Sequence, residues 1–242
     1  MNLQDTIGRC LVKEVRIDAD CLSLAGTLTI PDDAKGIVLF AHGSGSSRHS
    51  PRNQFVAKAL VANGMATLLF DLLTPREEVL DQRTASLRFD IDLLSKRLVG
   101  ATRWSMRNAD TQSLRIGYFG ASTGAAAALA AAARMQESVA AVVSRGGRPD
   151  LAGRALRLVL APTLLIVGGR DETVLELNWM ALRQLHCAPK ELIVIPGATH
   201  LFKEPGTLEE VARAASRWFS RYLVDKKAEG SVSPDDQHYR RR

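Results

Sequence analysis

One stretch of the sequence, residues 114–135, constrains the fold more than any other. It begins with bulky apolar residues typical of a buried strand and continues into an alanine-rich segment of very high helix propensity. Between them lies the turn GASTG, from Gly120 to Gly124, so the pattern predicts a strand that turns directly into a helix. A glycine at each end leaves room for neighbouring backbone, and Ser122 would stand exposed at the crest. The plainer interpretation is a tight strand-to-helix turn with a small residue at its top.

The composition fits one α/β domain over residues 1–225, followed by a polar and flexible tail over residues 226–242. Apolar residues make up 46% of the chain and aromatic residues only 5%, so the core is expected to be mainly aliphatic. That is typical of a parallel sheet covered by helices.

The order of the remaining segments predicts an α/β fold with a mostly parallel central sheet and helices on both faces. Two partly alternating segments form an antiparallel start, and strands then alternate with helices. Strands are expected over residues 12–17, 22–30, 36–41, 66–70, 114–119, 139–143, 163–167 and 192–195. Helices are expected over residues 53–63, 87–101, 124–135, 173–185 and 208–223, with a polar loop over residues 74–78. Only about twenty residues separate Val143 from Thr163, too few for an inserted cap domain.

Charge and cysteine content exclude several classes of protein. The net charge is +6, of which the tail contributes +2 from five basic and three acidic residues, and the rest is spread without a basic stripe. We therefore expect no nucleic-acid partner. Three cysteines without a C-x-x-C spacing argue against a disulfide framework and a structural zinc site. Without an apolar leader or a run of about 20 apolar residues, we expect a cytoplasmic protein with no membrane partner.

A serine hydroxyl is a weak nucleophile unless an imidazole removes its proton and a carboxylate orients that imidazole. His200 follows the last predicted strand, and Asp171 follows the strand before it. Ser122, Asp171 and His200 are therefore the candidate catalytic residues, in the chain order of the α/β-hydrolase triad. Asp150 is the alternative acid, and Asp171 could instead only cap the following helix.

Four motifs carry a resemblance to the dienelactone-hydrolase-like branch of the α/β-hydrolase family, over about residues 22–223. They are HGSGSS at residues 42–47, GASTG at 120–124, GGRDE at 168–172 and GATHLF at 197–202. The resemblance implies an α/β-hydrolase fold and hydrolysis of a small ester, thioester or lactone through an acyl-enzyme, without a cofactor. Dienelactone hydrolases proper have a cysteine where this chain has Ser122, which favours a more general esterase.

The loop after the third strand is the expected partner of Ser122 in forming an oxyanion hole. In this fold one donor is the N–H after the nucleophile, here Thr123, and the other comes from that loop, where we assign Ser44, with Gly45 as the alternative. Gly45 and His42 are further candidates for contact with the substrate, and His42 could also hold the loop through its ring. A metal site is not expected, because no i, i+4 histidine pair or carboxylate partner completes one.

Four arginines in or beside these loops could clamp an anionic substrate. They are Arg48, Arg52, Arg145 and Arg148. Arg145 is the strongest candidate, because the glycines after it leave room at the strand end, and Arg48 is also carried forward.

Two other functions remain open on the sequence alone. One is a binding protein with an α/β-hydrolase fold and no catalysis, since fold does not fix function. The other is an acyltransferase that uses the same acyl-enzyme. The sequence sets no oligomeric state.

Overall fold

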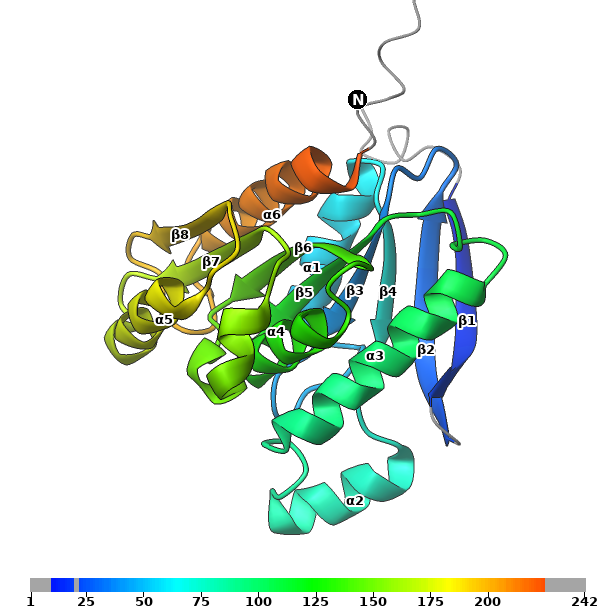
Figure 1. The fold of residues 1–242 in the computed structure, drawn as a ribbon, viewed down its shortest axis with the longest axis horizontal. Helices are drawn as coiled ribbons and strands as arrows, with labels where there is room; N and C mark the ends of the chain where they lie inside the picture. Colours follow the sequence, from blue (N-terminus) through cyan, green and yellow to red (C-terminus); the bar gives the residue numbers. More distant parts are fainter. Residues whose placement is uncertain (1–9, 20–21, 225–242) are drawn as a thin grey trace, which may run out of the picture.

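An eight-stranded sheet organises the computed structural model, which describes residues 10–19 and 22–224 (Figure 1). The strand order is β1-β2-β4-β3-β5-β6-β7-β8. The strands are β1 (Cys10–Ala19), β2 (Leu22–Pro31), β3 (Ile37–Ala41), β4 (Ala66–Phe70), β5 (Ile116–Ala121), β6 (Val139–Arg145), β7 (Thr163–Gly168) and β8 (Lys190–Ile195).

The direction of the strands confirms the prediction of a mostly parallel sheet. β1 and β2 form an antiparallel pair, and β2 joins the sheet antiparallel to β4. From β4 through β8 every pairing is parallel. The central strands β3, β4 and β5 are buried along their whole length, as their continuous apolar sequences predict. The carboxyl ends of these parallel strands meet at one edge of the sheet.

Helices cover both faces of the sheet, as predicted (Figure 1). They are α1 (Pro51–Ala62), α2 (Pro75–Thr84), α3 (Ile91–Arg107), α4 (Thr123–Arg134), α5 (Glu172–Gln184) and α6 (Thr207–Leu223), with a 3₁₀ segment η1 (Pro149–Leu158). Buried side chains of α1 and α6 form one cluster with the sheet, and those of α3, α4 and α5 form a second cluster on the other face. The core therefore lies in two layers, one on each side of the sheet.

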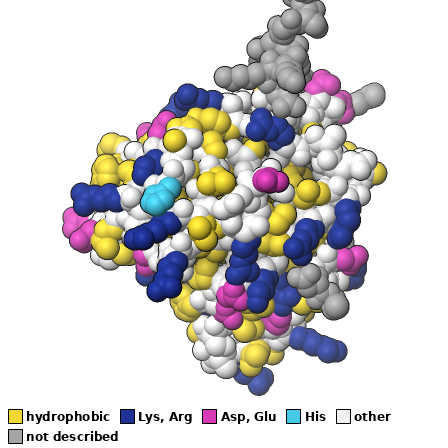
Figure 2. Space-filling model, viewed as in Figure 1, with side chains coloured by type: hydrophobic (Ala, Val, Ile, Leu, Met, Phe, Trp, Pro, Cys, Tyr) yellow, Lys and Arg dark blue, Asp and Glu magenta, His cyan; other side chains and the backbone are white. Residues whose placement is uncertain are grey.

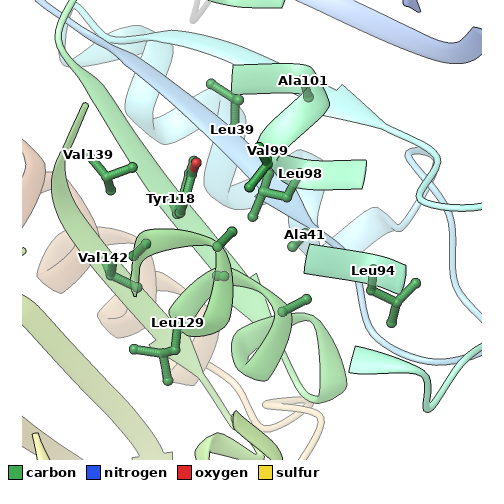
Figure 3. Close-up of a cluster of buried hydrophobic side chains, with 14 of the residues drawn as sticks. Leu39, Ala41, Leu94, Leu98, Val99, Ala101, Tyr118, Leu129, Val139 and Val142 are labelled. Atoms are coloured by element: carbon green, nitrogen blue, oxygen red, sulfur yellow. The ribbon is translucent and has the colours of Figure 1, made fainter. Parts of the chain in front are cut away.

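The alanines of α4 bring this helix very close to its neighbours. Residues 123–132 are all buried, so α4 is enclosed between β5, α3 and η1 instead of presenting an outer polar face. Figure 3 shows part of the adjoining core, to which Leu129 of α4, Leu98 of α3 and Tyr118 of β5 belong. The Tyr118 hydroxyl shares a hydrogen bond with the Thr102 hydroxyl, which satisfies its polar atom in this core. This packing fixes the start of α4, where Ser122 is located.

Three segments differ from the sequence prediction. The predicted polar loop over residues 74–78 is wrong: a helix, α2, starts there, and Thr74 and Glu77 form a reciprocal capping box at its beginning. The segment between β6 and β7 contains η1, which was not predicted. The long amphipathic helix α3 begins at Ile91, four residues later than expected.

No cap domain is inserted among the described residues, in agreement with the prediction. The predicted tail over residues 226–242 lies outside them. None of the helices that the structure describes is long and apolar enough to cross a membrane. On the face shown in Figure 2, lysine and arginine side chains are scattered among acidic and apolar ones. The expectation that the protein has no nucleic-acid partner stays a prediction.

Candidate active site

Ser122 occupies a strained turn between β5 and α4. Its backbone lies at φ 52° and ψ −121°, a conformation that residues with a side chain rarely adopt. A Cβ at Gly124 would lie 2.2 Å from the carbonyl oxygen of Ala41, and one at Gly120 would lie 2.4 Å from the Cα of Ala125. Both glycines of the G-x-S-x-G pattern are thus required by close backbone contact, and the turn has the geometry of a nucleophile elbow.

Asp171 and His200 are brought together from two loops at the same edge of the sheet. The loop after β7 carries Asp171 and the loop after β8 carries His200, and Asp171 Oδ2 lies 2.7 Å from His200 Nδ1. Asp171 occupies the N-cap position of α5, but its side chain makes no capping hydrogen bond. Its carboxylate contacts the imidazole instead. Asp150, the alternative acid, is paired with Arg148 at 2.8 Å.

Ser122 and His200 line the same cavity, which has a volume of about 250 Å³. The His200 side chain is 38% exposed and that of Asp171 only 14%, so the imidazole faces the cavity with the carboxylate behind it. No hydrogen bond joins Ser122 Oγ to the ring of His200 among the described residues. Bonds of this kind are often long before a substrate is bound, so the lack of one here does not argue against Ser122 as the nucleophile and His200 as its base.

The loop that carries His200 is held by Glu204, a residue that sequence reasoning missed. Its carboxylate accepts hydrogen bonds from the Thr199 backbone N–H at 3.1 Å and from the Thr199 hydroxyl at 2.7 Å. These hydrogen bonds from Thr199 lower the pKa of Glu204, so the carboxylate stays ionised. The other side of the loop packs on Gly146, where a Cβ would lie 3.2 Å from the His200 carbonyl oxygen. Thr199 and Glu204 lie five positions apart in the sequence, and this threonine–glutamate spacing is the signal that could have indicated the hydrogen-bonded turn.

The two predicted oxyanion donors flank Ser122. Ser44 lines the cavity beside Ser122, and Thr123 lines a small adjoining hollow that Ser44 also borders. Neither backbone N–H, that of Ser44 nor that of Thr123, donates a hydrogen bond to any other described residue. Two unpaired N–H groups beside a serine at a helix N-terminus can hold a developing negative charge.

His42 supports the loop after β3 and does not present its ring to the cavity. Its Nε2 accepts a hydrogen bond from the Leu72 N–H at 3.1 Å, and its Nδ1 donates to the Gly43 carbonyl oxygen at 3.0 Å. Burial lowers the pKa of His42, which favours the neutral ring that this arrangement needs. Both nitrogens are engaged, which fits the predicted role of His42 in holding this loop. Its contact with a substrate stays a prediction. Gly45, at φ 63°, also lies outside the cavity of Ser122.

The four candidate arginines separate into two groups. Arg48 is ion-paired with Asp71, donates its backbone N–H to the same carboxylate at 2.8 Å, and lines a different hollow. Its contact with a substrate stays a prediction. Arg148 is paired with Asp150. Arg145 and Arg52 lie in the cavity of Ser122.

Within residues 10–19 and 22–224, no cluster of three or more His, Cys, Asp or Glu side chains could hold a metal ion. The two cysteines in this part of the chain, Cys10 and Cys187, are not disulfide-bonded. The chemistry available in the cavity is that of a hydroxyl, an imidazole with its carboxylate, unpaired amides and guanidinium groups.

Strand order, elbow and uncapped sheet edge define an α/β-hydrolase fold. The family model of the dienelactone hydrolase family matches residues 24–224, so the chain belongs to this family, as the four motifs indicated. A dienelactone hydrolase of known structure from Anabaena variabilis is 59% identical, with a TM-score of 0.87 over 88% of this chain and 99% of that one.

More distant structures share the fold alone. Est1E from Butyrivibrio proteoclasticus is 17% identical, with a TM-score of 0.70 over 86% of this chain and 98% of that one. A serine hydrolase without a lid from Xanthomonas campestris is 20% identical, with a TM-score of 0.69 over 88% of this chain and 95% of that one.

The curated relatives are longer proteins. A Mycobacterium tuberculosis protein that carries the provisional name of a phosphoribosyl transferase is 58% identical over 211 residues, which are 87% of this chain and 46% of the relative. The same protein from a second strain matches equally. The chain thus spans about half the length of the curated relatives it matches.

Proposed function

We propose that this chain is a serine hydrolase that cleaves a small ester, thioester or lactone through an acyl-enzyme. One observation carries the proposal: the Asp171–His200 pair opens onto the cavity in which the strained Ser122 stands. The match to the dienelactone hydrolase family supports hydrolysis, and the 59% identical Anabaena protein is described as a dienelactone hydrolase.

In the proposed reaction, Ser122 Oγ attacks the carbonyl carbon while His200 Nε2 takes its proton. Asp171 accepts the hydrogen bond of Nδ1–H, which sets the tautomer and stabilises the imidazolium. The amides of Ser44 and Thr123 stabilise the oxyanion, a contribution typically worth about 3 kcal/mol per donor. His200 then protonates the leaving group, and a water deprotonated by His200 releases the acid and restores Ser122.

Ser122 stands where the resemblance places a cysteine in dienelactone hydrolases proper, and this supports a general esterase. Phosphoribosyl transfer is not proposed, because that name belongs to relatives of about twice this length, whereas residues 24–224 match a hydrolase family. An acyltransferase would share each step up to the acyl-enzyme and differ in the acceptor. We also propose a cytoplasmic location, because the cysteine pattern fits a reducing compartment.

The proposal is tested by hydrolysis of p-nitrophenyl acetate by the full chain. Ser122→Ala and His200→Gln are expected to lower kcat by at least about 10³-fold, because each removes a group that acts in the transition state. His186→Gln is the matched control, since this histidine is exposed and does not line the cavity. A Ser122→Ala variant as active as the wild type would refute the assignment.

A further inference from the structure

The cavity of Ser122 contains two arginines and no acidic side chain. Arg52, from the first turn of α1, and Arg145, from the end of β6, both line it. Asp171 lies behind His200 and is already bonded to its ring. The remaining polar groups of the lining are neutral, among them the hydroxyls of Ser46 and Ser50. With His200 neutral, the lining of this cavity carries two positive charges.

Arg145 is a buried cation without an anionic partner. Only 6% of the residue is exposed, and its Nε is buried without a hydrogen-bond partner. Among the described residues, the one hydrogen bond of the guanidinium runs from Nη2 to the neutral Asn53 Oδ1 at 3.3 Å. Its Cζ lies 5.8 Å from the centroid of the Phe202 ring. Burial and the nearby charge of Arg52 lower the pKa of Arg145 to about 10, so it stays charged at neutral pH. A buried charge of this kind is costly unless a counter-ion joins it.

Arg52 lines the same cavity and is a second guanidinium with a nitrogen that lacks a hydrogen-bond partner. The residue is half-buried, and its Nε is buried without a partner. No carboxylate lies within ion-pair distance of Arg52 or Arg145 in the part of the chain that the structure describes. The first turn of α1 contains no acidic residue, so the positive end of the helix dipole adds to this charge.

Three other arginines near this edge of the sheet have acidic partners, in contrast to Arg52 and Arg145. Arg48 is paired with Asp71, Arg148 with Asp150, and Arg88 with Asp81. The chain thus neutralises the arginines that hold its loops together. It leaves unpaired the two that face Ser122.

We propose that Arg52 and Arg145 bind a phosphate monoester group of the substrate, so that the compound hydrolysed at Ser122 carries a dianionic phosphate. This inference rests on the proposed function and adds the substrate class to it. Two guanidinium groups match the charge of a dianion, whereas a single carboxylate would leave one of them uncompensated. Each guanidinium can donate two parallel N–H bonds, and a phosphate offers enough oxygens for both. The hydroxyls of Ser46 and Ser50 supply further donors at the start of α1.

Calorimetric titration of the full chain with inorganic phosphate tests the site without requiring turnover. At constant ionic strength, phosphate is expected to bind at least about tenfold more tightly than acetate or succinate. Arg145→Gln and Arg52→Gln are each expected to weaken phosphate binding at least about tenfold. Arg217→Gln, which removes an exposed arginine of α6 outside this cavity, should leave it unchanged. Acetate or succinate binding as tightly as phosphate would overturn the proposal, as would a folded Arg145→Gln or Arg52→Gln variant with unchanged affinity.

Competition with p-nitrophenyl acetate separates this inference from the proposed function. Phosphate should inhibit the wild type competitively, and Arg52→Gln should raise the inhibition constant for phosphate at least about tenfold. Arg217→Gln, outside this cavity, should hydrolyse the ester and be inhibited by phosphate like the wild type. If the chain binds phosphate but hydrolyses no ester, the proposed function fails and the phosphate site stands. If it hydrolyses the ester and phosphate neither binds nor inhibits, the phosphate site fails and the hydrolase stands.

Discussion

The strain at Ser122 is held by contacts on both sides of the residue. Its N–H donates to the Arg145 carbonyl oxygen at 3.2 Å, and its own carbonyl oxygen accepts from the Arg148 N–H at 3.0 Å. Gly120 and Gly124 confine the backbone before and after it. A conformation that costs about 1–3 kcal/mol persists only where the surroundings determine it so completely. Residues 145–148 therefore both bound the elbow and carry Arg145 into the cavity.

Replacing Asp171 by Asn tests which acid orients the imidazole. We expect Asp171→Asn to lower kcat for p-nitrophenyl acetate by about 10³- to 10⁴-fold, because the amide can stabilise the wrong tautomer and no longer offsets the imidazolium charge. Asp150→Asn is the matched control and should leave kcat unchanged, since Asp150 is bonded to Arg148. A larger loss in Asp150→Asn than in Asp171→Asn would show that the acid is misassigned.

Single residues differ in how far the sequence alone could predict them. Asp171 and His200 follow consecutive strands of a parallel sheet, so their meeting could be anticipated from topology. The partner of Arg48 could not, because Arg48 lies within the loop between β3 and α1, and the sequence does not determine the path of that loop. The same holds for Arg52, whose lack of a partner is a property of the whole surrounding structure.

At the scale of elements, the start of helix α2 was indicated by the sequence, but the indication was overlooked. Thr74 precedes Pro75, and Glu77 follows three residues after Thr74, which is the pattern of a capping box with proline in the first turn. The segment is highly polar, so its composition suggested a loop. The end of α2 is held by Asp81, which accepts hydrogen bonds from the N–H groups of Leu87 and Arg88.

The capping box can be tested by its effect on stability. Thr74→Ala is expected to lower the free energy of unfolding by about 1 kcal/mol, because the N–H of Glu77 loses its side-chain acceptor. Thr74→Ser keeps the hydroxyl and should stay close to the wild type. Urea unfolding followed by circular dichroism measures both variants. Equal destabilisation of the two would show that the hydroxyl is not what matters at this position.

The central strands and α4 were predictable because their patterns are unambiguous. Continuous apolar runs at β3, β4 and β5 and the alanine-rich α4 match the structure to within two residues at either end. η1 was not predictable in the same way. Its chain kinks at Gly153, where φ is 52° and ψ −127°, and neither helical nor strand periodicity describes such a segment.

At the scale of the whole molecule, the parallel sheet is what turns distant positions into one site. Each parallel strand delivers the loop after it to the same edge, so the loops after β3, β5, β6, β7 and β8 meet there. The family membership covers the region that contains all of them. Without a cap domain among the described residues, the cavity opens directly at this edge. Its small volume favours small substrates.

Labelling by a fluorophosphonate probe, with the modified residue located by mass spectrometry, tests the central claim most directly. The probe reacts with a serine only if a base has activated its hydroxyl and an oxyanion hole receives the phosphoryl oxygen. We expect one adduct on the wild-type chain, on the peptide that contains Ser122, and none on Ser122→Ala. An adduct at another residue, or equal labelling of both proteins, would contradict the account.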